Sequence, residues 1–334
     1  MARGKLTLRV LAGLTAFALA GLTACGTGGG APGASGGGGE KKAIGVSVAD
    51  QKSLFYVAAV QGMQAQAEKR GYKLVVTSAN NNSSQQVSQV NDLLTQQVGA
   101  LIFTSQDSTA AAAGVKAANK AQVPVIAVDQ RPESGQGELA TYIATDSVKA
   151  ARELCTWMFQ QMGGSGEIAI LHGVLGSTAE IQRTQGCQEA IKATPGIKVV
   201  AEETANWDET EAFKATQNIL AAHPQLKAVF GESDAMGLGA AKAAEQANRH
   251  DGMWFVGIDG FPTMFDGVKA GLTQATMAQQ PYHMGEIAVD NAIQIMEGGA
   301  ALPAEQYQDT VLINKETVDQ NDVTKFYGPN AKSS

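Results

Sequence analysis

The sequence predicts an α/β protein of two similar lobes, each built on a doubly wound, largely parallel sheet. Short apolar runs rich in β-branched residues alternate with longer segments of helical period, as in strands joined by crossover helices. From residue 41 onward the chain has about 290 residues, more than one hydrophobic core usually organises. Polar and aromatic residues recur directly after the strand-like runs. We therefore expect two lobes whose strand ends line a common cleft.

Short runs along the chain have the composition of strands. Because they are almost continuously apolar rather than alternating, we expect them to be buried on both faces. In chain order they are AIGVSV (43–48), KLVVT (73–77), ALIF (100–103), VPVIAV (123–128), EIAILHG (167–173), IKVVAE (197–202), KAVFGE (227–232), MWFVGID (253–259) and TQATMAQ (273–279).

Between these runs lie segments with the period of a helix. Apolar residues stand three and four apart in 54–72, 83–99 and 208–224. Each segment ends in Gly or next to Pro, as helices commonly do. We find no repeat of the solenoid kind, so the alternation indicates a doubly wound chain.

The first 25 residues have the layout of an export signal. Arg3 and Lys5 precede an apolar stretch that begins at Leu8 and is too short to span a bilayer stably. The closing LTAC resembles the lipobox of bacterial lipoproteins, which implies cleavage after residue 24 and lipid on Cys25. An ordinary signal peptide with a chance cysteine is the alternative. Residues 26–39, rich in Gly, predict a flexible tether that extends to about 42.

The charge balance limits the class of partner. The chain carries 25 Lys and Arg against 32 Asp and Glu, a formal net charge of −7, and no basic run follows the signal. This argues against nucleic acid or an anionic membrane face as partner.

Residues after the strand-like runs predict the cleft, because ligands in open α/β sheets bind beyond the carboxyl ends of strands. A lone Asp at such a place is often a helix cap or a turn former, and this explains Asp146 and Asp208 well. The cleft candidates at these positions are Asp50, Phe55, Thr104, Asp129, Gln130, Arg131, Trp207, Ser233, Asp234 and Asp259.

A set of motifs in family order carries a resemblance to a known family. In chain order they are AIGVSVADQKSLFY, DLLTQQVGALIFTSQDS, VPVIAVDQRP, YIATDS, GSTAEIQRTQGCQEA, TANWDETEAF, AAHPQLKAVFGESDAMGLGA, VGIDGFP and LTQATMAQQPYHMGEIAV. Through them the chain resembles a periplasmic sugar-binding protein of the ribose-binding type, the substrate-binding component of an ABC importer.

The resemblance spans about 43–313 and implies a type I fold: two lobes, 43–145 with 280–309 and 146–279 with 310–325, then a tail from 326 to 334. Three hinge crossings are implied near 144–147, 278–281 and 309. The same lobes follow a DNA-binding headpiece in transcription repressors, and no headpiece precedes Ala43.

The resemblance implies aromatic contacts to a sugar. Phe55 and Tyr56 match the family's two aromatics on one sugar face, and Trp207 matches the aromatic on the other. Stacking suits sugars because their C–H faces are apolar and their hydroxyls point outward. Core packing is the alternative for each ring, and for Tyr56 it stands level with stacking.

Polar contacts are implied at four positions. Asp129 and Asp259 match the family's two sugar-binding carboxylates, and Arg183 matches the arginine that donates to sugar oxygens. Gln279 matches a glutamine that reaches the cleft from the hinge. A cap or turn remains the alternative for each Asp.

The chain departs from the ribose-binding pattern at several contacts, which implies a ligand other than ribose: a hexose, another pentose, or a polyol such as inositol. These are left unranked. Asparagines are replaced by Ser53, Thr104 and Ser233; Gln130 stands where an arginine is expected, with Arg131 displaced by one; and Asp50 is an added carboxylate.

Cys155 and Cys187 are expected in the same lobe of this fold. An exported chain sits where disulfides persist, so we expect them to pair. Two buried thiols are the alternative.

An enzyme is the rival class, and the sequence argues against it. No GxSxG motif occurs, and the four histidines, His172, His223, His250 and His283, lack metal-binding spacing. Residues 163–166, GGSG, precede a strand and predict a turn rather than a phosphate loop.

We therefore predict an extracytoplasmic, lipid-anchored sugar- or polyol-binding protein without metal or cofactor. The expected partners are the ligand, an ABC permease and, through Cys25, the membrane; we expect a monomer. A receptor domain that serves a sensor or chemotaxis protein uses the same lobes and is the alternative.

Overall fold

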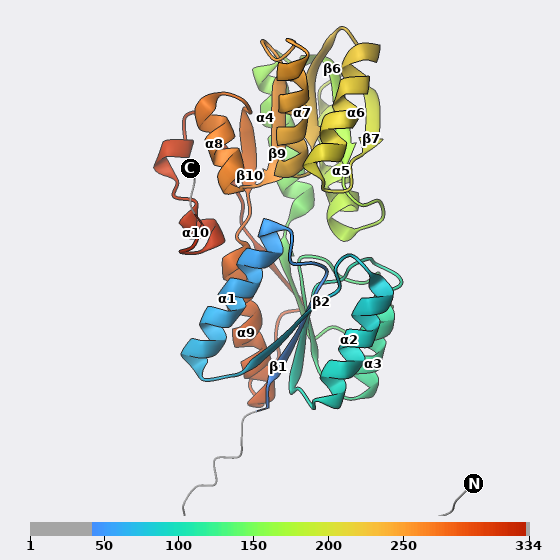
Figure 1. Cartoon of the computed structure of the whole chain (residues 1–334), viewed down its shortest axis with the longest axis vertical. Helices are drawn as coiled ribbons and strands as arrows, with labels where there is room; N and C mark the ends of the chain where they lie inside the picture. Colours follow the sequence, from blue (N-terminus) through green and yellow to red (C-terminus); the bar gives the residue numbers. More distant parts are fainter. Residues whose placement is uncertain (1–41, 332–334) are drawn as a thin grey trace, which may run out of the picture. The chain divides into compact units, whose positions relative to one another are not determined.

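The computed structural model describes residues 42–331, which form two α/β lobes (Figure 1). The predicted signal peptide, Cys25 and nearly all of the tether lie outside the described residues. Within residues 42–331 the strands form two six-stranded sheets, one for each lobe. The predicted fold class, two doubly wound parallel-sheet lobes, is confirmed.

The first lobe has a fully parallel sheet in the order β2-β1-β3-β4-β5-β11. Helices α1 and α9 pack side by side on one face, and α2 and α3 cover the other (Figure 1). The strands are β1 (Ile44–Val48), β2 (Leu74–Ser78), β3 (Ala100–Phe103), β4 (Val125–Val128), β5 (Thr141–Thr145) and β11 (Glu305–Gln308), and the helices are α1 (Leu54–Arg70), α2 (Ser83–Thr95), α3 (Ala112–Lys120) and α9 (Pro281–Met296).

The second lobe has the order β7-β6-β8-β9-β10-β12, parallel except for β12, which runs antiparallel to β10. Helices α4 and α5 pack together, as do α6 and α7, and two apolar clusters form beneath these pairs. The strands are β6 (Ser165–His172), β7 (Gly196–Thr204), β8 (Leu226–Gly231), β9 (Trp254–Asp259), β10 (Ala275–Ala278) and β12 (Val311–Asn314), and the helices are α4 (Ser147–Gln161), α5 (Thr178–Ala193), α6 (Glu209–Ala222), α7 (Asp234–Gln246) and α8 (Pro262–Ala270).

Within residues 42–331 the chain crosses between the sheets three times. It leaves the first lobe after β5, returns from β10 to α9, and crosses again between β11 and β12. The second crossing ends at Pro281, the first residue of α9. Its missing N–H costs nothing there, because the N–H groups of the first helical turn have no partner within the helix. Because the strands of each sheet are parallel and joined by crossover helices, their carboxyl ends lie at the same end of the sheet. The polar residues that follow these strands therefore gather there.

Burial of the strands differs from the sequence prediction at the sheet edges. The central strands β1, β3 and β4 are buried along their whole length. In contrast, β2 is only half-buried, and β7 is half-buried or exposed except at Ile197. Both are edge strands, which one neighbouring strand covers instead of two, so the prediction that they are buried on both faces was wrong.

Helix starts follow the local sequence. Asp146 accepts from the Lys149 backbone N–H at 2.9 Å, and Asp208 accepts from that of Glu211 at 2.8 Å, so both cap the helices that follow. None of the helices in the described part is long and apolar enough to cross a membrane.

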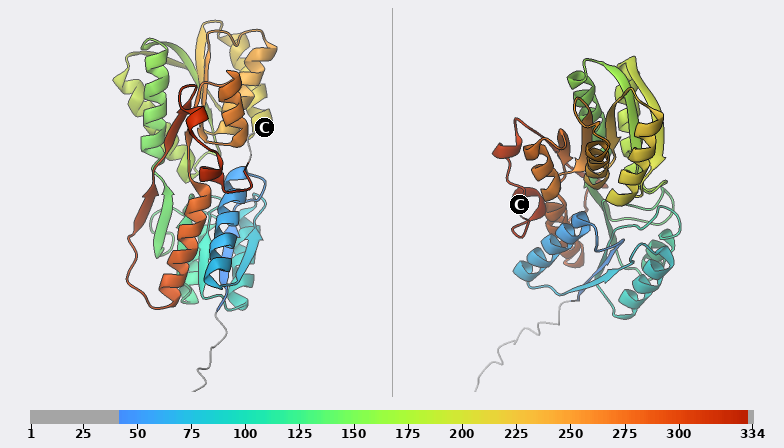
Figure 2. Two further views of the ribbon diagram at one scale, coloured as in Figure 1. Left: turned by 90° about the vertical axis from the view of Figure 1, so that its left-hand side faces the viewer. Right: turned by 45° about the horizontal axis from the view of Figure 1, so that its top comes forward.

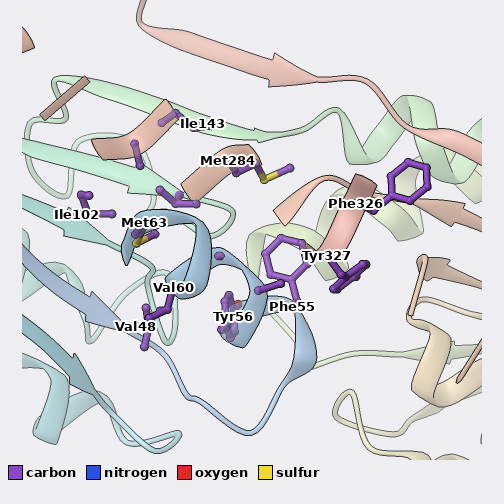
Figure 3. Close-up of a cluster of buried hydrophobic side chains, with 14 of the residues drawn as sticks. Val48, Phe55, Tyr56, Val60, Met63, Ile102, Ile143, Met284, Phe326 and Tyr327 are labelled. Carbon is purple, nitrogen blue, oxygen red and sulfur yellow. The ribbon is translucent and has the colours of Figure 1, made fainter. Parts of the chain in front are cut away.

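After β12 the chain forms a short 3₁₀ turn (Val318–Gln320) and helix α10 (Thr324–Tyr327), which packs against α1 and α9 of the first lobe (Figure 2). Phe326 and Tyr327 lie in the same buried cluster as Phe55 and Met284 (Figure 3). The sequence prediction placed residues 326–334 in a tail, whereas the structure buries Phe326 and Tyr327.

The second lobe contains a disulfide between Cys155 of α4 and Cys187 of α5, with a Cα–Cα distance of 5.4 Å. Both cysteines are fully buried in the cluster beneath these helices. The bond closes a loop with a sequence separation of 32.

We predict that removing this disulfide destabilises the protein. In the loop-entropy model a loop of this length contributes about 3–4 kcal/mol, because the bond restricts the unfolded chain. Denaturant unfolding of the C155A/C187A double variant should show that loss, with oxidised wild type as reference. An unchanged unfolding free energy would mean that native-state strain offsets the entropic gain.

Candidate functional site

The first-lobe side of the site joins Tyr56 of α1 to two residues after β4. The Tyr56 hydroxyl donates to Asp129 Oδ2 at 3.0 Å and accepts from Gln130 Nε2 at 3.0 Å. Burial raises the pKa of Tyr56 well above its ordinary value, and the Asp129 charge raises it further. Tyr56 therefore remains a neutral donor to the Asp129 carboxylate.

The backbone at Asp129 is held in an uncommon conformation. Its φ of 62° lies in the left-handed region, which non-glycine residues seldom adopt. Two contacts fix it: its N–H donates to the Ile143 carbonyl at 2.8 Å, and its carbonyl accepts from the Tyr142 hydroxyl at 2.5 Å. Strained backbone positions concentrate at functional sites, so this geometry supports Asp129 as a site residue.

Arg131 turns toward the edge of the first sheet. Its Nη1 forms an ion pair with Glu305 Oε1 at 2.6 Å, and its guanidinium lies 4.3 Å from the centre of the Tyr142 ring. The side chain that the sequence placed among the ligand contacts is thus engaged within the first lobe.

The second-lobe side of the site surrounds Arg183 of α5, which is 3% exposed. Arg183 Nη1 donates to the Glu232 carbonyl at 2.5 Å and lies 3.6 Å from Asp259 Oδ1. Gln279 Nε2 donates to the same Asp259 oxygen at 2.8 Å. Three predicted residues, Arg183, Asp259 and Gln279, therefore meet at one place although they come from distant segments.

Two of these side chains keep buried polar atoms without a partner. Among the described residues, Arg183 Nε and Gln279 Oε1 are both buried and make no hydrogen bond with the protein. Buried polar groups almost always have a partner, so each exception needs an explanation. Together they offer one unused donor and one unused acceptor beside Asp259.

A second buried aspartate, Asp234, is in contact with Asp259: its backbone N–H donates to Asp259 Oδ2 at 3.3 Å. Asp234 Oδ2 accepts from the backbone N–H groups of Gly260 and Phe261, each at 2.7 Å, and so orders the turn after β9. Burial raises the pKa values of both Asp234 and Asp259; for Asp234 the Asp259 charge adds to the rise, whereas for Asp259 the Arg183 charge opposes it.

Charges of the two lobes face one another at this site. Burial raises the pKa of Asp129, and attraction by Arg183 of the other lobe opposes that rise. Asp129 in turn raises the pKa of Asp259. Asp129 of the first lobe therefore lies within electrostatic reach of Arg183 and Asp259 of the second.

The three predicted aromatic residues lie in this region. Phe55 and Tyr56 are 5% and 7% exposed and meet edge to face, with 5.4 Å between ring centres. Figure 3 shows both in the apolar cluster of α1. Trp207 lies in the second lobe, 5.5 Å from the Arg183 guanidinium, and packs on Gly173 so closely that a Cβ there would overlap its indole.

Four other predicted site residues, Asp50, Ser53, Thr104 and Ser233, take part in turns, helix caps and buried contacts of the main chain. Asp50 accepts from the Ser53 N–H at 2.9 Å and shapes the turn before α1, of which Ser53 is the N-cap. Thr104 is buried, and its carbonyl accepts from Gln86 Nε2 at 2.7 Å. Ser233 caps α7 through the Met236 N–H at 3.4 Å. No hydrogen bond joins these four side chains to Asp129, Arg183 or Asp259.

The lobes also touch beside Arg131. The Thr178 hydroxyl donates to the Arg131 carbonyl at 3.2 Å, and the Ser108 hydroxyl donates to the Gly176 carbonyl at 2.9 Å. A cavity of about 200 Å³ lies here, lined from both lobes by residues that include Arg131, Thr178 and Gln182.

A polar cluster around His172 and Glu232, which the sequence did not reveal, supports Arg183 through the main chain of Glu232. His172, at the end of β6, places Nδ1 3.2 Å from Glu232 Oε1 and Nε2 3.0 Å from Glu202 Oε2. Thr184 donates to Glu232 Oε1 at 2.6 Å. His172, Glu180 and Glu232 are the described group whose donor atoms lie close enough, within 4.8 Å, to hold a metal ion. The hydrogen bonds at both ring nitrogens fit a protonated imidazole, so we assign the cluster to positioning Glu232 and, through its carbonyl, Arg183.

Comparisons with known proteins find similar sequences and a similar fold. A family model described as periplasmic binding protein domain matches residues 44–300. The ribose import binding protein RbsB of Bacillus subtilis is 34% identical over 262 residues, which cover 78% of this chain and 84% of that protein. The xylitol-binding protein of Mycolicibacterium smegmatis is 37% identical over 233 residues, 70% of this chain and 66% of that protein. A crystal structure of an ABC transporter periplasmic solute binding protein from Actinobacillus succinogenes with bound D-allose matches with a TM-score of 0.80 at 28% identity, covering 84% of this chain and 100% of that chain.

We predict that His172 makes stability depend on pH. The hydrogen bond to Glu232 raises the pKa of His172 to about 9 from 6.5. Because the folded-state pKa is the higher one, its contribution is complete below about pH 6.5 and is lost as the pH rises through about 9. Melting curves from pH 6 to 10 should show His172→Gln less stable than wild type at pH 6 and nearly equal to it at pH 10.

The exposed His283, which pairs with Glu286 at 3.1 Å, provides the matched control. His283→Gln should run parallel to wild type across this range. Parallel curves for His172→Gln would mean that the imidazole is neutral in the folded protein.

Proposed function

Because the chain belongs to the periplasmic binding protein family, in its ribose-binding type, we propose that it captures a monosaccharide or related polyol between its lobes and delivers it to an ABC importer permease. The observation that carries the proposal is that the carboxylate of Asp129 in the first lobe faces the Arg183–Asp259 pair of the second within electrostatic reach. A ligand that bonds to all three must contact both lobes.

The chemistry of these groups suits a polyhydroxylated ligand. Carboxylates accept from pairs of hydroxyls, and the planar guanidinium donates to ring or hydroxyl oxygens. Arg183 Nε and Gln279 Oε1, which lack protein partners, supply a further donor and acceptor. The rings of Phe55 and Trp207, one from each lobe, suit the apolar C–H faces of such a ligand.

Ligand binding then couples to closure of the lobes. The hydrogen bond from Tyr56 orients the Asp129 carboxylate, and the ion pair with Asp259 orients the Arg183 guanidinium. Both charged groups are therefore held in place where the lobes meet. A sugar that contacts both lobes favours the closed arrangement by its higher affinity for it. The closed monomer then docks on the permease, and the ligand leaves chemically unchanged.

The ligand class follows from the relatives. Proteins named for ribose, xylitol and bound D-allose lie at 28–37% identity, so five- and six-carbon sugars and polyols are the first candidates. The replacements at Ser53, Thr104, Gln130 and Ser233 support a ligand other than ribose.

We predict that a panel of pentoses, hexoses and polyols contains a ligand that raises the melting temperature of a protein lacking residues 1–25. A ligand at a hundred times its Kd adds about 2.7 kcal/mol to the stability. For that ligand, calorimetry should show Asp129→Asn weakening binding by about tenfold or more, because a charged acceptor is lost.

Asp92→Asn, a change of the same kind on the exposed face of α2, is the matched control and should leave the Kd unchanged. A folded Asp129→Asn variant with wild-type affinity would exclude Asp129 from the site. A ligand-free protein that responds to no sugar or polyol would overturn the sugar-binding function itself.

We also propose that Cys25 carries the lipid that anchors the protein outside the cell membrane. The sequence LTAC supports it. Cys25→Ser should move the expressed protein from the membrane to the soluble fraction, and the intact mass of the wild type should exceed that of residues 25–334 by the mass of acyl chains. A wild-type mass without added lipid would contradict the anchor.

A further inference from the structure

Helix α10, at the end of the described chain, contacts both lobes. Phe326 and Tyr327 are 4% and 3% exposed although they belong to the last ordered helix. On the first-lobe side, α10 packs against α1 and α9, and a Cβ at Gly328 would overlap the ring of Tyr282 in α9. Figure 2 shows α10 beside α1 in both views.

The same two rings contact the second lobe. The Tyr327 ring lies edge-on to Phe261, with 5.7 Å between centres, and the Phe326 ring lies 6.1 Å from that of Phe265. Phe261 and Phe265 belong to the segment that follows β9 directly. The apolar cluster of α1 therefore continues through α10 into the second lobe.

The Tyr327 hydroxyl reaches the ligand site. It donates to the backbone carbonyl of Asp259 at 2.9 Å. Burial raises the pKa of Tyr327 well above its ordinary value, and the charges of Asp259 and Asp234 raise it further, whereas Arg183 lowers it. The hydroxyl thus stays protonated among the charged groups of the site.

We propose that Tyr327 is a positioning residue of the ligand site: its ring packs between the lobes and its hydroxyl fixes the backbone from which the Asp259 carboxylate projects. The inference rests on the proposed function for its effect on affinity. Residue 327 lies beyond residues 44–300, so the match to the family model does not extend to this contact.

The ring and the hydroxyl have separable effects. The Asp259 carbonyl also accepts from the Gln279 N–H at 2.9 Å, so removal of the Tyr327 hydroxyl leaves it with a partner. Stability should therefore change little. What is lost is the restraint on Asp259 from the side of α10.

The test compares Tyr327→Phe, Tyr327→Ala and wild type. Melting temperature, Kd and dissociation rate are measured with D-ribose and xylitol, and hydrogen exchange of the ligand-free protein is measured over residues 259–264. Tyr327→Phe should keep the melting temperature within about 2 °C, raise Kd about 3–10-fold through faster dissociation, and speed exchange in 259–264. Tyr327→Ala should also lower the melting temperature, because it removes the buried ring.

Tyr72→Phe is the matched control. It removes a hydroxyl that donates to Glu297 at 2.8 Å in the first lobe, and it should leave Kd and exchange at 259–264 unchanged. The proposal is overturned if Tyr327→Phe keeps wild-type Kd and exchange, or lowers only the melting temperature. If wild type binds neither probe, the exchange of ligand-free Tyr327→Phe alone decides the positioning role, and the full panel of pentoses, hexoses and polyols separately decides the proposed function.

Discussion

The structure depends on the buried guanidinium of Arg183. A buried charge without a partner is strongly destabilising, and here Asp259 lies 3.6 Å from the guanidinium while Asp129 of the other lobe lies within its electrostatic reach. Two acidic residues at the ends of strands β4 and β9 can be buried near one another because the positive charge of Arg183 acts on both. The position of α5, which carries Arg183, therefore decides whether the two strand ends form a common site.

Arg183 is itself held by layers of polar contacts. The Glu232 carbonyl accepts a hydrogen bond from Arg183 Nη1, and the Glu232 carboxylate accepts hydrogen bonds from Thr184 and His172. His172 also forms a hydrogen bond with Glu202 on β7. Each layer fixes the orientation of the one before it, which is how precise sites are usually supported. Protein contacts thus orient the second-lobe half of the site without a ligand.

The sequence predicted most of the fold because its central strands are continuous apolar runs. It missed β11, an edge strand whose EQYQ is short, polar and half exposed. It treated β5 as a crossover segment because β5, although fully buried, leads directly into the first crossing. It named Asp129 and Asp259 from their places at strand ends, whereas Arg183, which lies inside α5, was named only through the family resemblance.

It did not reveal the contacts that support them. Glu180 and Thr184 stand four residues apart beside Arg183, which is a weak signal, but Glu202 and Glu232 come from other strands. Tyr327 gave only the signal of two adjacent aromatics in a polar stretch. Long-range partners of this kind depend on the sheet order, which spacing along the chain does not encode.

The placement of the crossings determines how the lobes can move. The crossings run from β5 to α4, from β10 to α9 and from β11 to β12. Strands β5 and β11 lie at one edge of the first sheet, and β10 and β12 lie at one edge of the second, whereas β2 and β7 lie at the opposite edges. Only Asp309 and Thr310 separate β11 from β12, so this edge permits rotation and almost no translation. Opening is then a rotation about that edge, and displacement grows with distance from it. The loops after β2 and β7 travel farthest, so they set the width of the entrance through which a ligand must pass.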